Sequence, residues 1–254
     1  MVENSEKLEK LVNKQLGEFY KARLEKIQEL DLKKTLSRKN PYLLRAIGTE
    51  KASEIVEYLL NALLSSSDET IFGNTFVEPI ARMISKGVVA SGSGVDFVIE
   101  TATKYSAYGI KSGTNWGNSS QKAQLKTDFE KLRSRLYKIE KQFDPVVGHG
   151  YGTKNTPPGS EGGWRDVSGQ EFWKEITGDS EFYLKLVQLM KDSPQNHRVE
   201  FKKKWEAVVN KFTQEFIKDF CNKDGSIDWD KLVILVSKKR ELKKKKEQLK
   251  KKNK

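Results

Sequence analysis

An aspartate lies inside one short segment whose pattern is typical of a strand, and a lysine ends the next such segment. Asp96 belongs to GVDFVIE (94–100), and Lys111 closes a second short strand predicted over 107–110. Two strands this close in sequence predict an antiparallel hairpin. Carboxylates hold Mg²⁺, and a nearby lysine stabilises developing charge and helps to activate a water molecule. The pair is therefore a candidate for metal-assisted chemistry on phosphate.

A third charged residue, Glu100, falls on the same face of the predicted strand as Asp96, because side chains alternate with a period of two. Two acids and a lysine would then converge on one pocket. The alternative is a hairpin that faces solvent, with Asp96 and Lys111 in a surface ion pair.

The segment that follows Lys111 is a polar loop, SGTNWGNSSQ, which leads into a predicted helix. A helix N-terminus favours anions, and Ser, Asn and Trp side chains suit contacts with phosphate and sugar. Asn118 and Gln121 have the spacing of a capping box. An ordinary capped loop is the alternative. The candidate contact residues are Ser112, Asn115, Trp116, Asn118, Ser119 and Gln121.

The loop and its surroundings resemble a subgroup of type II restriction endonucleases of the PD-(D/E)xK nuclease superfamily. The most specific part is IKSGTNWGNSSQ (110–121), because an IKSGPNWGNSSQ-like string follows a GxD-containing strand in that subgroup. The resemblance covers about residues 38 to 220. Its other parts are GVDFVIE (94–100), KNPYLLRAIG (39–48) leading to SSSDET, and GQEFWKEITGDSEFYLKL (169–186).

The resemblance implies an α/β fold, a mixed sheet flanked by helices, with a metal site at one end of the hairpin. The family aspartate corresponds to Asp96 and the family lysine to Lys111, and Glu78 is the candidate for an acid on the preceding helix. One position departs from the family pattern, since Gly109 stands where an acid is expected two residues before the lysine. Glu100 is the expected substitute, and Gln121 is another candidate.

The function implied is Mg²⁺-dependent, sequence-specific cleavage of double-stranded DNA in a restriction–modification system. A palindromic target would call for a homodimer with one active site for each strand. Two alternatives remain at this point. One is a structure-specific repair nuclease of the same superfamily, and the other is a non-catalytic DNA-binding protein, which Gly109 favours.

Composition limits the class of protein. The 254 residues include 25 aromatic residues but one Cys and two His, which excludes a disulfide scaffold and a Cys/His zinc module. No run of 18 apolar residues predicts a membrane span, and MVENSEKLEK lacks a signal-peptide core, so we expect a cytoplasmic protein with no membrane partner. The net charge of +12 lies mostly in 238–254, which holds 11 basic and 2 acidic residues.

Hydrophobic periodicity and Gly/Pro positions predict the elements that position these residues. We expect a long N-terminal helix (1–38), a nuclease core with helical additions (39–225) and a C-terminal helix with a basic tail (226–254). The predicted strands are those of the hairpin and a short one at 145–148, and 152–168 is predicted as loop. The predicted helices are 3–34, 49–64, 71–84, 118–143, 170–176, 180–191, 198–220 and a last one from 228.

Overall fold

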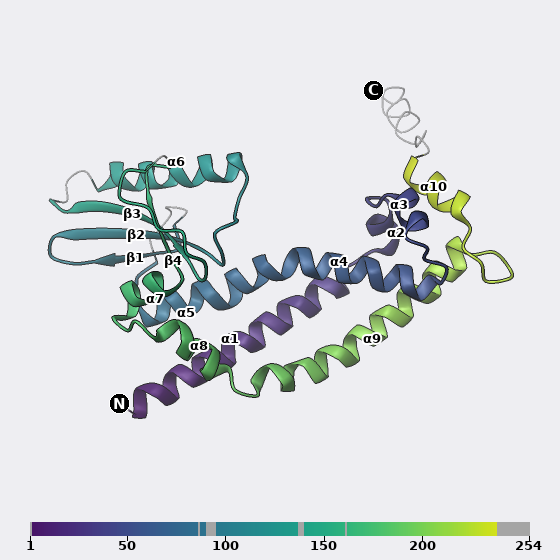
Figure 1. The fold of residues 1–254 in the computed structure, drawn as a ribbon, viewed down its shortest axis with the longest axis horizontal. Coiled ribbons are helices and arrows are strands. Elements are labelled where there is room, and N and C mark those ends of the chain that lie inside the picture. Colours follow the sequence, from purple (N-terminus) through teal and green to yellow (C-terminus); the bar gives the residue numbers. More distant parts are fainter. Residues whose placement is uncertain (1, 86, 90–94, 137–139, 161, 238–254) are drawn as a thin grey trace, which may run out of the picture. The chain divides into compact units, whose positions relative to one another are not determined.

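The computed structural model describes residues 2–85, 87–89, 95–136, 140–160 and 162–237. Its sheet has the order β1-β2-β3-β4, with β1 antiparallel to β2 and the other pairs parallel. The strands are β1 (Phe97–Glu100), β2 (Lys104–Lys111), β3 (Gln142–His149) and β4 (Arg165–Ser168). The predicted hairpin and the mixed α/β fold are thereby confirmed (Figure 1).

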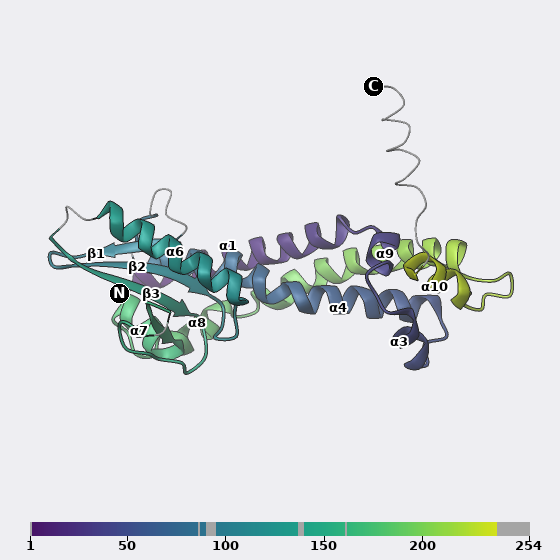
Figure 2. The same ribbon diagram turned by 90° about the horizontal axis from the view of Figure 1, so that it is seen from above.

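Helices cover both faces of this sheet. Helix α6 (Ser119–Arg135) lies on one face, while α5 (Glu78–Ile84) and α7 (Gly169–Thr177) lie on the other (Figure 1). Figure 2 shows α6 from above, lying across the strands. Leu125, Phe129 and Leu132 of α6 are buried against the sheet. The sheet is therefore enclosed along its length, and its strand ends remain for a site.

The helices before the hairpin differ from the prediction in two places. The long first helix ends early, since α1 (Val2–Gln28) is followed by a short α2 (Leu32–Leu36) that Asp31 caps. The break predicted at SSSDE is wrong, because α4 (Ala52–Phe72) runs through it. Arg23 forms two hydrogen bonds with Asp68, of 2.8 and 3.0 Å, inside that stretch. Helix propensity is a weak preference that such contacts override.

Helix α4 continues into α5 through a π-helical turn, η1 (Gly73–Val77). Gly73 is the first residue of this turn and does not end the helical run. Pro79 does not end it either, because Pro is tolerated at the first positions of a helix. π-Helical turns of this kind often occur at functional sites. Glu78 is the first residue of α5, directly after the turn.

The segment after the loop was predicted less well. The helix predicted over 118–143 ends at Arg135, and Phe143 belongs to β3. Pro145 lies inside β3, where it is tolerated because β4 pairs with β3 only from Val146 onward. Strand β4 falls within the predicted loop 152–168, since its four residues, RDVS, are too few and too polar to show an apolar pattern. The end of the predicted helix at 137–139 lies outside the described residues.

Helix α3 (Pro41–Ala46) lies where no helix is predicted. Helices α7, α8 (Phe182–Met190) and α10 (Trp229–Ser237) agree with the prediction to within two residues, and α9 (Ser193–Phe220) begins five residues before its predicted start. The basic tail at 238–254 lies outside the described residues, and the division into 1–38, 39–225 and 226–254 stays a prediction.

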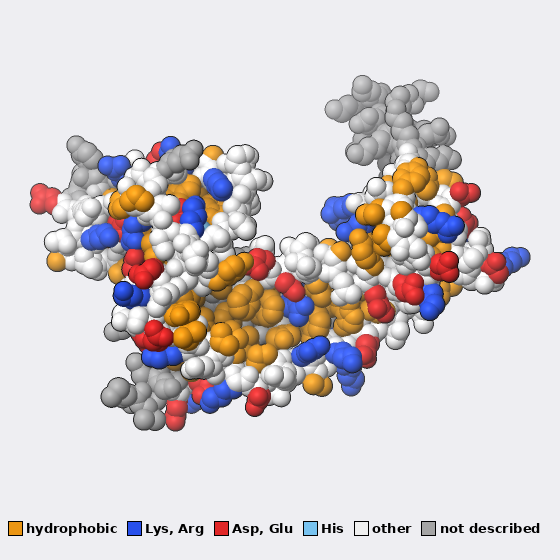
Figure 3. Space-filling view, viewed as in Figure 1, with side chains coloured by type: hydrophobic (Ala, Val, Ile, Leu, Met, Phe, Trp, Pro, Cys, Tyr) orange, Lys and Arg blue, Asp and Glu red, His pale blue; other side chains and the backbone are white. Residues whose placement is uncertain are grey.

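The chain divides into two compact units, of which the first comprises the described parts of 1–24 and 65–201 and contains the sheet. The second comprises the described parts of 25–64 and 202–254. It has an ion pair between Lys33 Nζ and Asp219 Oδ2 at 3.0 Å, and the Arg45 guanidinium lies over the Trp229 ring. Hydrophobic side chains are exposed over α3 and α10 in this second unit (Figure 3).

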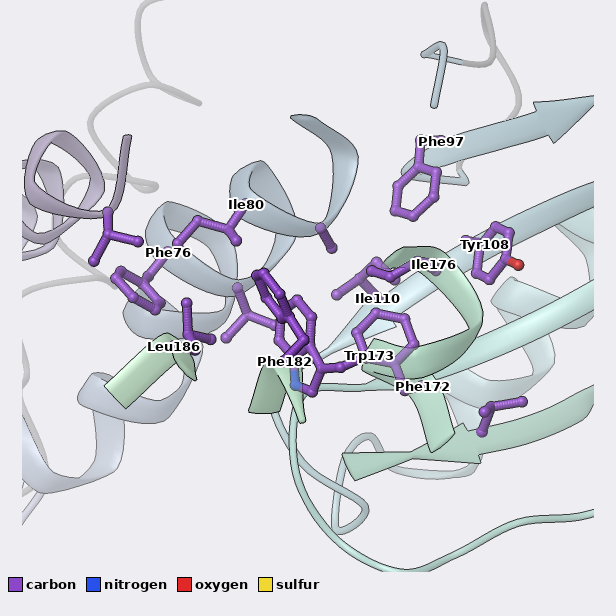
Figure 4. Close-up of a cluster of buried hydrophobic side chains, with 14 of the residues drawn as sticks. Phe76, Ile80, Phe97, Tyr108, Ile110, Phe172, Trp173, Ile176, Phe182 and Leu186 are labelled. Carbon is purple, nitrogen blue, oxygen red and sulfur yellow. The ribbon is translucent and has the colours of Figure 1, made fainter. Parts of the chain in front are cut away.

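The core of the first unit holds the rim of the sheet in place (Figure 4). Phe97 and Tyr108 stack with ring centroids 4.9 Å apart, and Ile110 is buried in the same cluster. Burial of each such side chain stabilises the fold by roughly 1.5–3 kcal/mol. Because Asp96 precedes Phe97 and Lys111 follows Ile110, both charged residues are fixed at the edge of this core. The rest of the cluster includes Phe76, Ile80, Phe172, Trp173, Ile176, Phe182 and Leu186.

Candidate active site

Two hydrogen bonds hold Asp96 at the end of strand β2. Its backbone N–H donates to the carbonyl of Tyr108 at 2.9 Å, and its Oδ2 accepts from the backbone N–H of Ile110 at 2.5 Å. Because Ile110 immediately precedes Lys111 in β2, the Asp96 carboxylate lies next to the backbone of the residue before the lysine. The hairpin register thus brings Asp96 and Lys111 to the same end of the sheet.

Glu78 reaches the same region from helix α5. Burial raises the pKa of Glu78, and repulsion from Asp96 raises it further, while Arg82 and Lys111 act in the opposite direction. Burial also raises the pKa of Asp96, opposed by the hydrogen bond from Ile110 and by the charges of Lys111 and Arg82. Arg82 is only loosely paired with Glu78, at 3.9 Å. Two half-buried carboxylates thus share one site without full compensation of their charge.

Lys111 has a defined aromatic neighbour. Its Nζ lies 5.0 Å from the centroid of the Trp116 ring, in a cation–π contact. The lysine also lines a cavity of about 580 Å³ in the first unit. The Lys111 ammonium group therefore lies near the carboxylates of Glu78 and Asp96 and also beside this cavity.

Glu100 lies elsewhere. It pairs with Tyr105 in the strand register, at the opposite end of β1 from Asp96, and its carboxylate accepts from Lys141 Nζ at 2.6 Å. Four residues of strand span about 13 Å. The structure therefore does not bring Glu100 to Asp96, although both have the same strand parity.

The absence of an acid at position 109 has a packing reason. A Cβ atom on Gly109 would lie 3.2 Å from Cδ1 of Leu125 and 3.8 Å from Cζ of Phe129. This position faces the apolar side of α6, so a carboxylate there would be buried without a partner. The close approach of α6 to β2 thus accounts for glycine.

The loop after Lys111 forms one wall of the cavity, to which Ser112, Asn115, Trp116 and Gln121 contribute. Asn118 and Ser119 are not among its lining residues. The predicted capping box is confirmed, since the Asn118 side chain accepts from Gln121 N and the Gln121 side chain accepts from Asn118 N, each at 3.0 Å. The loop candidates therefore divide into four that line the cavity and two at the start of α6.

Sequence reasoning missed part of the opposite wall. The Glu69 carboxylate of α4 accepts hydrogen bonds from Ser112 Oγ and, at 2.9 Å, from Tyr151 Oη. Gln124 and Asp128 of α6 also line the cavity. Glu69 escapes sequence reasoning because its stretch, SSSDET, predicts a helix break. Tyr151 gave one signal, its place in the glycine-rich string GHGYG (148–152).

The donor set fits a hard divalent cation. Among the described residues, no group of three or more His, Cys, Asp and Glu is placed to hold a metal ion. The pair of carboxylates supplies oxygen ligands, and a cation between them would offset the repulsion that raises the pKa of Glu78. Mg²⁺ commonly binds through one or two carboxylates together with substrate phosphates and water.

Comparison with known families decides the assignment. Residues 6–198 match the family described as type II restriction endonuclease EcoO109I, and this range includes Glu78, Asp96, Lys111 and the whole cavity. The chain belongs to this family. It is therefore a type II site-specific deoxyribonuclease that binds DNA, in a family that generally uses a divalent metal ion, as the resemblance implied. No curated protein matches the chain.

Membership in the EcoO109I family favours a sequence-specific endonuclease over a structure-specific repair nuclease or a non-catalytic DNA-binding protein. In the described part of the chain, no helix has the length and apolar character needed to cross a membrane.

Proposed function

We propose that this endonuclease hydrolyses both strands of duplex DNA with Mg²⁺ and belongs to a restriction–modification system. The grouping of Glu78, Asp96 and Lys111 at one end of the sheet carries the proposal. Asp96 and Glu78 would hold the cation, since their charges are close together and incompletely compensated. Glu100 is left out of this metal site because it pairs with Lys141 at the far end of β1.

Each group has a defined part in the reaction. When bound, Mg²⁺ supplies positive charge that neutralises the phosphate oxygens. Lys111 stabilises the charge that develops on the phosphate and helps to orient the attacking water. The water oxygen forms a bond with phosphorus and loses a proton, while the bond from phosphorus to the leaving sugar oxygen breaks and that oxygen takes up a proton.

The loop after Lys111 binds the DNA around the scissile phosphate. Ser112, Asn115, Trp116 and Gln121 line the cavity beside Lys111 and suit contacts with phosphate and sugar. Asn118 and Ser119 lie at the N-terminus of α6, which favours an anion. The capping box would hold this helix end ready before DNA arrives.

The enzyme acts as a homodimer, so that one active site serves each strand of a symmetric target. The second unit exposes apolar side chains that a second copy would cover, namely Tyr42, Leu43, Ile47, Tyr58, Ile217 and Ile234. Sedimentation of the purified protein tests this point. Sedimentation as a monomer, both free and with DNA, would contradict it.

Digestion of several long duplex DNAs, with Mg²⁺ and with EDTA in parallel, tests the proposed activity. We expect discrete, reproducible fragments only with Mg²⁺, and none from the Lys111→Ala variant. Intact DNA in every lane, with a gel shift that disappears at high salt, would contradict the nuclease and indicate binding alone.

The link to a modification enzyme needs a separate comparison. DNA from the source cell should resist digestion, whereas the same DNA after amplification without modification should be cut. Equal cutting of both samples would contradict the restriction–modification context.

A further inference from the structure

The loop that carries Ser112 to Trp116 is anchored by three consecutive carbonyl groups. Lys111 O accepts from the backbone N–H of Gly150 at 3.0 Å, and Ser112 O accepts from that of Tyr151 at 3.1 Å. The third carbonyl, Gly113 O, lies 3.1 Å from Nδ1 of His149. Two anchors are thus backbone groups, and the third depends on one side chain at the end of β3.

His149 is completely buried, and both of its ring nitrogens face acceptors. Its Nε2 lies 2.7 Å from Oδ1 of Asp166, on β4. A carbonyl oxygen accepts only, so Nδ1 has to donate to Gly113. Burial alone would raise the pKa of Asp166, but hydrogen bonds from Lys154 and His149 lower it, so this carboxylate is ionised and also accepts. Only the protonated ring, with an N–H at each nitrogen, satisfies both contacts.

We propose that His149 in its protonated form is a positioning residue for the active site. It holds Gly113 O, and through it the loop that presents Ser112, Asn115 and Trp116 beside Lys111. This inference rests on the proposed function of that loop. His149 is completely buried and its ring contacts Gly113 and Asp166, so its effect on the reaction is through geometry.

Charged groups surround His149 on several sides. From β4 it faces Asp166, whose other oxygen pairs with Lys154 Nζ at 2.8 Å. From β2 its register partner is Lys111, whose ammonium lies over Trp116. Beyond the loop, Glu69 accepts from Ser112 and from Tyr151. Further charged groups line a cavity together with Asp166, and these are Arg165, Glu171, Lys174 and Glu175.

Loss of the ring proton would release the loop. A neutral ring has one N–H, and the carboxylate of Asp166 would retain it, because hydrogen bonds to charged groups are the stronger ones. The lone pair of Nδ1 would then face Gly113 O, and the third anchor would be lost. We therefore expect the rate of cleavage to fall when a rise in pH removes the ring proton, with a smaller effect on DNA binding.

Two variants separate the two contacts. In His149→Asn the amide nitrogen takes the place of Nδ1 and keeps the bond to Gly113, whereas in His149→Gln it takes the place of Nε2 and keeps the bond to Asp166. We expect His149→Gln to slow single-turnover cleavage by about 10- to 100-fold, as is common when a supporting partner is lost. His149→Asn should cut faster than His149→Gln, and its cleavage should lack the alkaline fall of the wild type. Equal loss in both variants, or an alkaline fall that persists in His149→Asn, would overturn the proposal.

A measurement on the unmutated histidine covers the case in which these variants fail to fold. The chain has two histidines, so His197→Gln leaves one ring for ¹⁵N NMR of the free protein. His197 stacks on Tyr20 and lies outside the active site. We expect both nitrogens of His149 to give imidazolium shifts while the ring is protonated, and the tryptophan fluorescence of the protein to change when the ring loses its proton. A neutral ring at every pH at which the protein is folded would overturn the proposal.

This experiment also separates the two proposals, since neither NMR nor fluorescence depends on cleavage. A protein that never cuts DNA but shows the coupled change in NMR and fluorescence would contradict the proposed function and retain the anchor. A protein that cuts DNA with a neutral His149 would do the reverse.

Discussion

Two pairs of acids in the first unit differ in how their charge is compensated. Glu78 and Asp96, at one end of the hairpin, have raised pKa values, with burial as the first cause in each. Asp144 and Glu175 are also partly buried, yet the pKa of each is lowered. Burial acts in the same direction at both places, so the difference comes from the partners.

Arg165 provides most of the compensation in the second pair. It donates to both oxygens of Asp144 at 2.8 Å and to both oxygens of Glu175 at 2.6 and 2.8 Å. Lys104 adds an ion pair to Asp144 at 2.6 Å, and Tyr108 donates to Glu175 at 2.6 Å. Hydrogen bonds from these groups outweigh the effect of burial on both carboxylates.

The first pair has no comparable partner among the described residues. Arg82 lies 3.9 Å from Glu78, and the Asp96 carboxylate accepts a hydrogen bond from the backbone amide of Ile110. A carboxylate cluster that the protein compensates fully is part of the framework. A cluster whose carboxylates still repel each other is suited to bind a cation that arrives with the substrate.

The largest expected effect follows from removing a charge of the first pair. Asp96→Asn should lower the cleavage rate with Mg²⁺ by about a thousand-fold or more, because a bound metal ion contributes several kcal/mol to the barrier and each 1.36 kcal/mol is tenfold. Single-turnover cleavage of a mapped duplex measures it, and thermal unfolding serves as the folding control. A folded Asp96→Asn variant that cuts within tenfold of the wild type would remove Asp96 from the metal site.

The second largest effect concerns the compensated pair. Arg165→Met should lower the free energy of unfolding by about 3–5 kcal/mol, because it leaves two partly buried carboxylates without their main partner. Denaturant unfolding near neutral pH measures the change. A loss below 1 kcal/mol would show that Lys104 and Tyr108 suffice.

The third prediction contrasts the two pairs by pH. The pKa of Glu78 is raised in the folded state, so its ionisation destabilises the protein as the pH rises from the unfolded pKa to the folded one. The pKa of Glu175 is lowered, so this residue stabilises the protein above its unfolded pKa, and the contribution is lost as the pH falls.

Substitution should therefore have opposite signs in the two pairs. At about pH 7 without metal, Glu78→Gln should stabilise the protein by about 0.5–2 kcal/mol, as is common when a strained functional site is relaxed. Glu175→Gln should destabilise it by about 1–3 kcal/mol, the cost of unmade hydrogen bonds. Both differences should shrink toward about pH 3, where carboxylates become protonated. Equal signs in unfolding experiments at the two pH values would contradict the comparison.

The sequence was sufficient for the hairpin, the capping box and the Asp96–Lys111 juxtaposition, because each follows from a local pattern. Strand β4 escaped because Arg165 and Asp166 are polar residues that become buried only through tertiary partners. The continuity of α4 through SSSDET depends on Arg23, which lies 45 residues from Asp68. Glu69 cannot be predicted for the same reason, because a residue in a predicted helix break is not assigned to any face of a helix.

Glu100 shows the limit of strand parity. The alternation of side chains puts Glu100 on the same face as Asp96, but it does not say how far apart the two residues lie along the strand. The register of the hairpin and the pairing with Lys141 decide that distance, and both are tertiary facts. Gly109 shows the same limit. A glycine stands there because α6 lies close to β2, and the sequence does not reveal that contact.

The most direct test of the uncompensated pair compares Glu78→Gln with Glu100→Gln in single-turnover cleavage of the same duplex over a series of Mg²⁺ concentrations. Each substitution removes one negative charge and little volume. We expect Glu78→Gln to lose cleavage or to require far more Mg²⁺, and Glu100→Gln to follow the wild-type curve. The reverse result, with Glu78→Gln active and Glu100→Gln inactive, would contradict the assignment of the metal site to Glu78 and Asp96.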